Sequence, residues 1–112
     1  CGKENPIGLK LDMKIEGDRC CAYFVARKDL ESYRDRMHGG ITSTLLDEVM
    51  GDYVFRVAGT PAYTAKLDIR FRSAVRIGER VKVEGWIVSH RGRLYITKGR
   101  VLHEDGTTAA EA

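Results

Sequence analysis

The sequence predicts an α+β fold in which a curved antiparallel β-sheet wraps around one long central α-helix. In residues 41–57 the apolar side chains leave little polar face on the predicted helix; they include Leu45, Leu46, Val49, Met50, Tyr53, Val54 and Val57. A helix that is apolar nearly all round is usually buried. Short segments on both sides of this helix alternate apolar and polar residues, as half-buried strands do. Because a flat sheet cannot bury every side of a helix, we expect the sheet to curve around it.

Length and composition describe one domain, residues 1–112. The chain has 43% hydrophobic and 31% charged residues, which is typical of water-soluble globular proteins. No apolar stretch approaches the roughly 20 residues of a membrane-spanning helix, so we expect no membrane partner. A chain of this length forms only a small core, and we expect a homo-oligomer, a dimer or a tetramer, to enlarge it.

Two strands are predicted before the helix. Residues 9–15 alternate apolar and polar side chains, and residues 20–26 form a second apolar run after a short turn. Cys20 and Cys21 lie in this run, where buried free thiols are the expected state. Three cysteines, two of them adjacent, fit neither a disulfide framework nor a metal site. This pattern favours a reducing compartment, and we expect a cytoplasmic protein.

Strands are also predicted after the helix. The helix is expected to stop near Gly59, because a proline follows two residues later. In residues 63–71 the odd positions are apolar and most even positions are charged or polar, which predicts a half-buried strand. Residues 81–88 and 94–102 are predicted as further strands, and one short segment follows them.

Positive charge is concentrated in residues 66–100, which carry 10 Lys or Arg and 3 Asp or Glu, a net +7. Such a stretch attracts nucleic acid or a phosphorylated small molecule, and a solvated sheet face is the third interpretation. Tyr63 and Phe71 fall on the predicted apolar face, so only a minority of the nearby aromatic rings can stack on bases. We therefore expect no nucleic-acid partner.

The most informative motif is His38-Gly39-Gly40, with Asp47 seven residues beyond it in the apolar run. A glycine pair lets another molecule approach the backbone closely, and the first amides of a helix have no partner within it. A carboxylate on a buried helix needs a partner or a chemical role. A hydrogen bond to a hydroxyl one turn earlier is the structural alternative for Asp47.

In order and spacing, the chain resembles the hotdog-fold acyl-CoA thioesterases, in the branch that includes phenylacetyl-CoA-type thioesterases. The resemblance implies the hotdog fold and a thioester hydrolase. It implies hydrolysis of an acyl-CoA to a free acid and coenzyme A, with coenzyme A as part of the substrate and no cofactor or metal. The segments that carry it are Asn5-Pro6-Ile7-Gly8-Leu9, His38-Gly39-Gly40, Leu45-Leu46-Asp47-Glu48 and Arg76-Ile77-Gly78-Glu79.

The resemblance also implies site residues at a dimer interface. Asp47 is implied as the nucleophile or general base, and the Gly40 backbone N–H is implied to polarise the thioester carbonyl. His38 is implied to line the same site, and Thr64 to reach in from the partner subunit to hold water or substrate. The implied substrate-binding residues are Gly39, Lys66, Phe71, Ser89, His90, Arg91, Gly92 and Arg93.

Two features depart from the family pattern. Ser32 stands six residues before His38, where relatives often carry an amide side chain, and residues 34–37 are more charged than usual. A non-catalytic protein that binds or senses acyl-CoA is the alternative function, because binding requires the glycine pair and the basic turn but not Asp47. The acyl group and the choice between covalent attack and water activation stay open.

Overall fold

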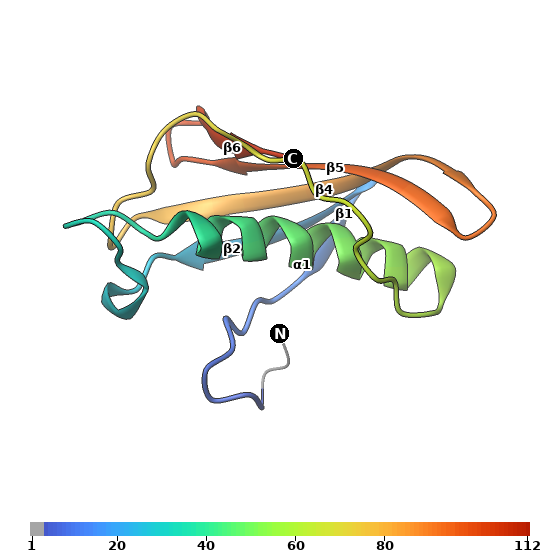
Figure 1. Cartoon of the computed structure of the whole chain (residues 1–112), viewed down its shortest axis with the longest axis horizontal. Helices are drawn as coiled ribbons and strands as arrows, with labels where there is room; N and C mark the ends of the chain where they lie inside the picture. The colour runs from blue at the N-terminus through green and yellow to red at the C-terminus, as the bar shows by residue number, and fades with distance from the viewer. Residues whose placement is uncertain (1–3) are drawn as a thin grey trace.

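The structure, a computed structural model, describes residues 4–112 and shows one long helix packed on one face of a curved six-stranded antiparallel sheet (Figure 1). Across the sheet the strands lie in the order β1-β2-β4-β5-β6-β3, which confirms the predicted fold class. The elements are β1 (Lys14–Glu16), β2 (Arg19–Val25), the short 3-10 helix η1 (Lys28–Leu30), α1 (Gly39–Ala58), β3 (Arg70–Phe71), β4 (Arg80–Arg91), β5 (Leu94–Leu102) and β6 (Thr108–Glu111).

Helix α1 begins at the glycine pair, two residues earlier than predicted, and ends where predicted. Gly59 caps it in the left-handed conformation, at φ 78°, which glycine adopts without strain. The expectation that α1 is buried on all sides is wrong for the single chain, because the sheet covers one side only. Phe55 and Val57, near its end, are 47% and 57% exposed. The buried helical residues are Thr42, Leu45, Leu46, Val49, Met50 and Val54.

Two glycines let α1 lie close to the sheet. Gly85 on β4 pairs with Gly99 on β5, and both lie beneath Met50. A Cβ at either position would come within 3.2 Å of Met50 atoms, and at Gly99 within 2.9 Å of a backbone oxygen. Larger side chains at these two positions would therefore collide with the middle of α1, and this packing contact explains both glycines.

Two predicted strands are largely absent. Residues 9–15 contribute only the start of β1, because Lys10 adopts a positive φ of 56° that interrupts an extended chain. Leu9 and Leu11 are nevertheless buried in the core. Residues 63–71 contribute only β3, and most of their predicted apolar face is exposed: Tyr63 is 93% exposed, whereas Ile69 is partly buried against the core. Among residues 4–112 of the single chain, no strand pairs with residues 60–69.

The remaining expectations for the core are met. Residues 20–26, 81–88 and 94–102 correspond to β2, β4 and β5. Cys20 and Cys21 are buried free thiols, as predicted, and burial raises the pKa of Cys20 to about 11. None of the helices in the described part of the chain has the length and apolar character needed to cross a membrane.

Candidate active site

Asp47 lies in the middle of α1 and is held by a hydroxyl from outside the helix. Thr64 Oγ1 donates a hydrogen bond to Asp47 Oδ1 at 2.5 Å, and the aspartate is only partly buried. The alternative partners one turn earlier are engaged elsewhere, since Ser43 and Thr44 donate to the Gly39 and Gly40 carbonyls. The carboxylate therefore has one oxygen fixed by Thr64 and keeps access to solvent. The family resemblance implies that Thr64 reaches the site from the partner subunit; in this structure Thr64 bonds to Asp47 of its own chain.

His38 caps the start of the helix. Its Nδ1 accepts a hydrogen bond from the Gly40 backbone N–H at 2.8 Å, so in this arrangement the amide expected to polarise a carbonyl is already occupied. The preceding amide, that of Gly39, has no hydrogen-bond partner among the described residues. The first free donor of this helix N-terminus is thus Gly39, at the end where the helix dipole favours negative charge.

The ring of Phe71, from β3, lies against Gly39 at the start of α1. A Cβ built on Gly39 would lie 3.5 Å from Phe71 Cε1, so the ring is in contact distance of the Gly39 backbone, while the phenylalanine remains 55% exposed. Asp47 is eight residues further along the helix, which corresponds to about 12 Å along its axis. One chain therefore does not present the Gly39 amide and the Asp47 carboxylate to the same small group.

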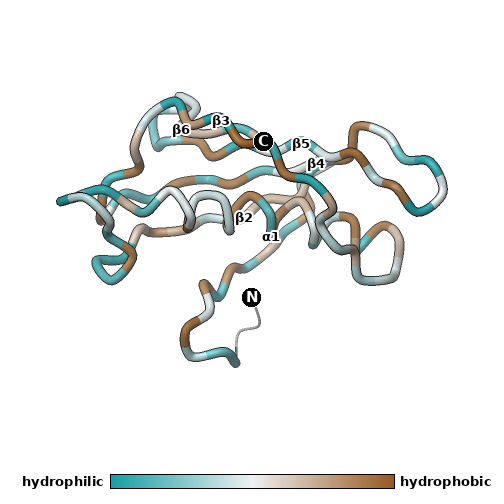
Figure 2. The backbone as a smooth tube through the Cα atoms, in the orientation of Figure 1, coloured by the Kyte–Doolittle hydropathy of each residue, from teal (hydrophilic) through white to brown (hydrophobic). Residues whose placement is uncertain are grey.

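The predicted phosphate-binding residues gather in the hairpin between β4 and β5. This hairpin extends beyond the sheet near the C-terminal end of α1, and its tip is hydrophilic (Figures 1 and 2). Arg91 and Arg93 flank Gly92, whose φ is 56°, and both arginines are exposed. His90 stacks on Tyr95 with ring centroids 4.7 Å apart, and Ser89, just before it, is also exposed.

The structure does not bring the other two predicted coenzyme A contacts to this hairpin. Lys66 lies in the exposed segment 60–69, 3.5 Å from Asp68, and Phe71 lies at the opposite end of the helix, beside Gly39. The predicted site residues therefore form two groups, one at the glycine pair and one at the hairpin, with Asp47 and Thr64 between them.

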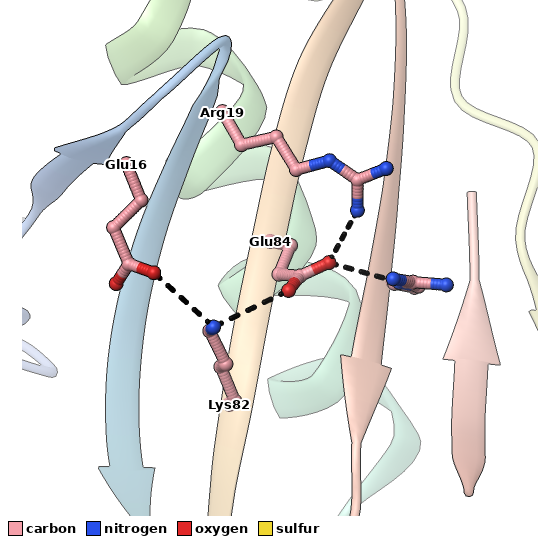
Figure 3. Close-up of polar contacts among 5 residues, drawn as sticks. Glu16, Arg19, Lys82 and Glu84 are labelled. Atoms are coloured by element: carbon pink, nitrogen blue, oxygen red, sulfur yellow. Dashed lines mark hydrogen bonds and ion pairs between the residues drawn. The ribbon is translucent and has the colours of Figure 1, made fainter. Parts of the chain in front are cut away.

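A charged cluster on the sheet face opposite the helix was missed from the sequence (Figure 3). Glu84 on β4 is 6% exposed and accepts hydrogen bonds from Arg19 at 2.7 Å and Arg100 at 2.9 Å. Lys82 Nζ lies 3.4 Å from the carboxylates of both Glu84 and Glu16. Burial acts to raise the pKa of Glu84, but the hydrogen bonds from the arginines outweigh it and leave the pKa below its ordinary value.

A second group that the sequence did not indicate consists of Ser73, His103 and Glu79. Ser73 Oγ lies 2.6 Å from His103 Nε2, and His103 Nδ1 lies 2.5 Å from Glu79 Oε2. These residues line an open hollow of about 470 Å³. Another hollow, of about 690 Å³, borders Trp86 and Arg100. No group of three or more His, Cys, Asp or Glu that could hold a metal ion occurs within residues 4–112.

Comparison with solved structures supports the fold. A thioesterase superfamily protein superimposes with a TM-score of 0.88 at 23% identity over 98% of this chain, which spans 57% of that protein. A Streptococcus mutans UA159 protein bound to acetyl CoA gives 0.81 at 23% identity, covering 96% of this chain and 87% of that one. The Escherichia coli PaaI protein from the phenylacetic acid degradation operon gives 0.83 at 14% identity, covering 92% and 79%.

These structures share the arrangement of one helix on a curved sheet, so the chain has the hotdog fold. No curated protein matches the sequence. The model of one protein family, the thioesterase superfamily, matches residues 35–110. The match takes in the glycine pair, all of α1 and strands β3 to β5, and with more than half of the sequence covered, the chain belongs to the thioesterase superfamily.

Proposed function

We propose that the protein hydrolyses an acyl-CoA thioester to a free acid and coenzyme A, with Asp47 as the nucleophile or general base. The observation that carries the proposal is the Thr64–Asp47 hydrogen bond. Fixing one carboxylate oxygen leaves the other oriented and solvent-accessible, as a group that attacks a carbonyl or removes a proton from water must be. Membership in the thioesterase superfamily supports the reaction class.

The thioester carbonyl binds at the start of a helix in this proposal. Charge builds up on that oxygen in the transition state, and an amide N–H aimed at it typically contributes about 3 kcal/mol. Gly39 is the donor that we assign, because its amide is without a described partner whereas the Gly40 amide bonds to His38. His38 then orders the helix start and leaves the neighbouring amide available.

The site is shared between two subunits in this proposal. Gly39 and Asp47 of one helix lie about 12 Å apart along its axis, so Asp47 acts with Gly39 of the partner subunit across antiparallel helices. Residues 60–69, which follow α1, form no main-chain hydrogen bonds with the described chain. Their alternating pattern suits pairing with the same segment of a second copy, which would enclose Thr64 and Asp47.

Coenzyme A binds through the β4–β5 hairpin. Arg91 and Arg93 are exposed on a glycine-containing turn, and arginine forks suit phosphate oxygens. The Streptococcus mutans neighbour is bound to acetyl CoA, which supports a ligand of this class. The hairpin extends near the C-terminal end of α1, away from Asp47 in the middle of the helix (Figure 1), as expected when phosphates and thioester occupy opposite ends of an extended ligand.

Release of free thiol from a panel of short, medium, aromatic and long acyl-CoAs tests the reaction directly. Asp47→Asn preserves side-chain volume and is expected to lower turnover by at least about 100-fold, near the lower end of acid–base contributions. Glu48→Gln is the control, because this neighbouring acid projects about 100° away around the helix. Tight acyl-CoA binding without turnover by the wild type would instead identify a binding or sensing protein.

A further inference from the structure

Hydrogen bonds join Ser73 to His103 and His103 to Glu79, which is the order that activates a serine as a nucleophile. A carboxylate only accepts hydrogen bonds, so His103 Nδ1 donates to Glu79 Oε2. In a neutral ring His103 Nε2 is then unprotonated and accepts the Ser73 hydroxyl hydrogen, across 2.6 Å. Serine on Nε2 and carboxylate on Nδ1 is the connectivity of a hydrolytic triad.

Each of the three residues is hydrogen-bonded to the surrounding backbone. The Ser73 amide donates to the Ala109 carbonyl, and the His103 amide donates to the Thr107 carbonyl. Glu79 Oε1 accepts the Arg76 amide at 3.2 Å, so both carboxylate oxygens are held. The His103 and Glu79 side chains are only 14% and 20% exposed. An orienting carboxylate and a base held in this way resist rotation away from the serine.

The serine is accessible to substrate. Ser73 is exposed and borders the hollow of about 470 Å³, which His103 and Arg76 also line. The amide that follows it, that of Ala74, has no hydrogen-bond partner among the described residues. The amide after a nucleophilic serine is a common oxyanion donor. None of the lining residues belongs to the proposed thioesterase site.

We propose that Ser73, His103 and Glu79 form a second hydrolytic site, which cleaves small uncharged carboxylic esters through an acyl-serine intermediate. The hollow is open and polar, with acids and an arginine on its border, so it suits a short acyl group rather than a long chain. This activity is separate from the proposed thioester hydrolysis and does not depend on it.

Each step balances within these residues and water. Ser73 Oγ bonds to the ester carbonyl carbon while its proton passes to His103 Nε2. The bond from that carbon to the alcohol oxygen breaks, and the alcohol leaves with the proton from His103. Water then attacks the acyl carbon and gives one proton to His103. The bond from that carbon to Ser73 Oγ breaks, which releases the acid, and His103 returns the proton to Ser73 Oγ.

A fluorophosphonate tests the nucleophile, because phosphonylation of serine expels fluoride and is seen as a mass increase. The expected result is one label per chain, mapped to Ser73, in the wild type and in Asp47→Asn. Ser73→Ala and His103→Gln are expected to abolish labelling, and Ser32→Ala, which changes another exposed serine, to preserve it. A purely structural Ser73–His103 bond would give no selective label. Melting curves identify variants that fail to fold.

Hydrolysis of p-nitrophenyl acetate then separates the two sites. Ser73→Ala is expected to reduce ester hydrolysis at least about 100-fold without affecting thioester hydrolysis, and Glu79→Gln to slow it by about 10-fold or more, because the histidine loses its orienting carboxylate. An unlabelled Ser73, labelling that persists in folded His103→Gln, or ester hydrolysis lost only in Asp47→Asn would each overturn the proposal.

Discussion

At the residue scale, the hydrogen bond from Thr64 joins Asp47 to a segment that has no other polar anchor in the described chain. Thr64→Val keeps the side-chain volume but removes the donor, so Asp47 loses its fixed orientation. We expect kcat to fall about 10- to 30-fold, which corresponds to about 1.5–2 kcal/mol, the lower end of the range for one hydrogen bond to a charged group. KM for the acyl-CoA is expected to change little, because the bond does not touch the bound nucleotide.

Thr64→Ser is the matched control for this prediction, since it restores the hydroxyl on a smaller side chain. Steady-state kinetics of both variants on one acyl-CoA distinguish the orienting role from packing. Equal losses in Thr64→Val, which lacks the hydroxyl, and Thr64→Ser, which keeps it, would show that kcat does not depend on the hydroxyl and would contradict the orienting role of Thr64.

The ionisation of Glu84 is expected to make the stability of the fold depend on pH. Its pKa in the folded chain lies below the ordinary value of 4.5, because hydrogen bonds from Arg100 and Arg19 outweigh burial. The ionised form therefore stabilises the fold above about pH 4.5, and this contribution is lost as the pH falls through the folded-state pKa. Glu84→Gln is expected to cost about 2–3 kcal/mol at pH 7, less than for a fully buried network because both arginines are partly exposed.

Urea unfolding at several pH values measures this effect. The difference in unfolding free energy between wild type and Glu84→Gln is expected to shrink as the pH falls from about 4.5 through the lowered folded-state pKa. A difference that stays constant over that range would show that the carboxylate charge does not stabilise this cluster.

At the scale of elements, the proposed role of the β4–β5 hairpin is to bind the nucleotide part of the substrate, and this role can be tested separately from catalysis. Changing Arg91 and Arg93 together to alanine is expected to raise KM for acyl-CoA about 10-fold and to leave kcat nearly unchanged, because phosphate contacts are the same in ground and transition states. For a thioester that lacks the nucleotide, KM is expected to be unaffected. The wild-type KM is expected to rise with salt, since exposed charges are screened within about 8 Å at physiological ionic strength.

Measuring KM for both substrates at low and high salt checks this prediction. If the double variant loses equal efficiency on both substrates, or none on either, the hairpin does not bind phosphate and its charges belong to a solvated face.

The elements differ in how well their sequences predict them. Helix α1, β4 and β5 are predicted by the sequence because their periodicity reflects packing within the same chain. The contact of Met50 with the paired glycines Gly85 and Gly99 is an example. Residues 63–71 were predicted as a long strand, since alternation indicates a buried face without indicating which chain buries it. The shortening of the first strand depends on a positive φ at Lys10, which a lysine does not signal.

Site residues that are close in sequence could likewise be predicted, whereas those brought together only by folding could not. Asp47 and the glycine pair were recognised because they are close in sequence and arranged on one helix. The Ser73–His103 pair spans 30 residues and the Arg19–Glu84 pair spans 65, so only the folded sheet brings their members together. The hydrogen bond from the Gly40 amide to His38 depends on the rotamer of the histidine side chain. The order of residues in the sequence does not determine that rotamer.

At the scale of the whole molecule, the single chain leaves large apolar side chains uncovered. Tyr63 is 93% exposed and Phe71 55% exposed, and both belong to the segment that has almost no strand partner. Exposed apolar groups clustered at an unpaired edge are typical of a surface that another chain covers. A second copy accounts for the exposed edge and for the distance between Gly39 and Asp47 with one arrangement.

Complementation between two inactive variants tests this shared site most directly. Asp47→Asn removes the reacting carboxylate. Gly39→Pro removes only the donor, because proline is well tolerated at the first helical position and His38 already has the extended backbone, at φ −59° and ψ 134°, that precedes proline. Each variant alone is expected to show almost no acyl-CoA hydrolysis.

Refolded together in equal amounts, with mixed oligomers verified by native mass spectrometry, they are expected to recover about a quarter of wild-type turnover. Half of the dimers are then mixed, and each mixed dimer has one site with an intact Asp47 and an intact Gly39 of the partner subunit. Recovery near this value supports acyl-CoA hydrolysis at a site built from two chains. Mixed oligomers that remain inactive would contradict it.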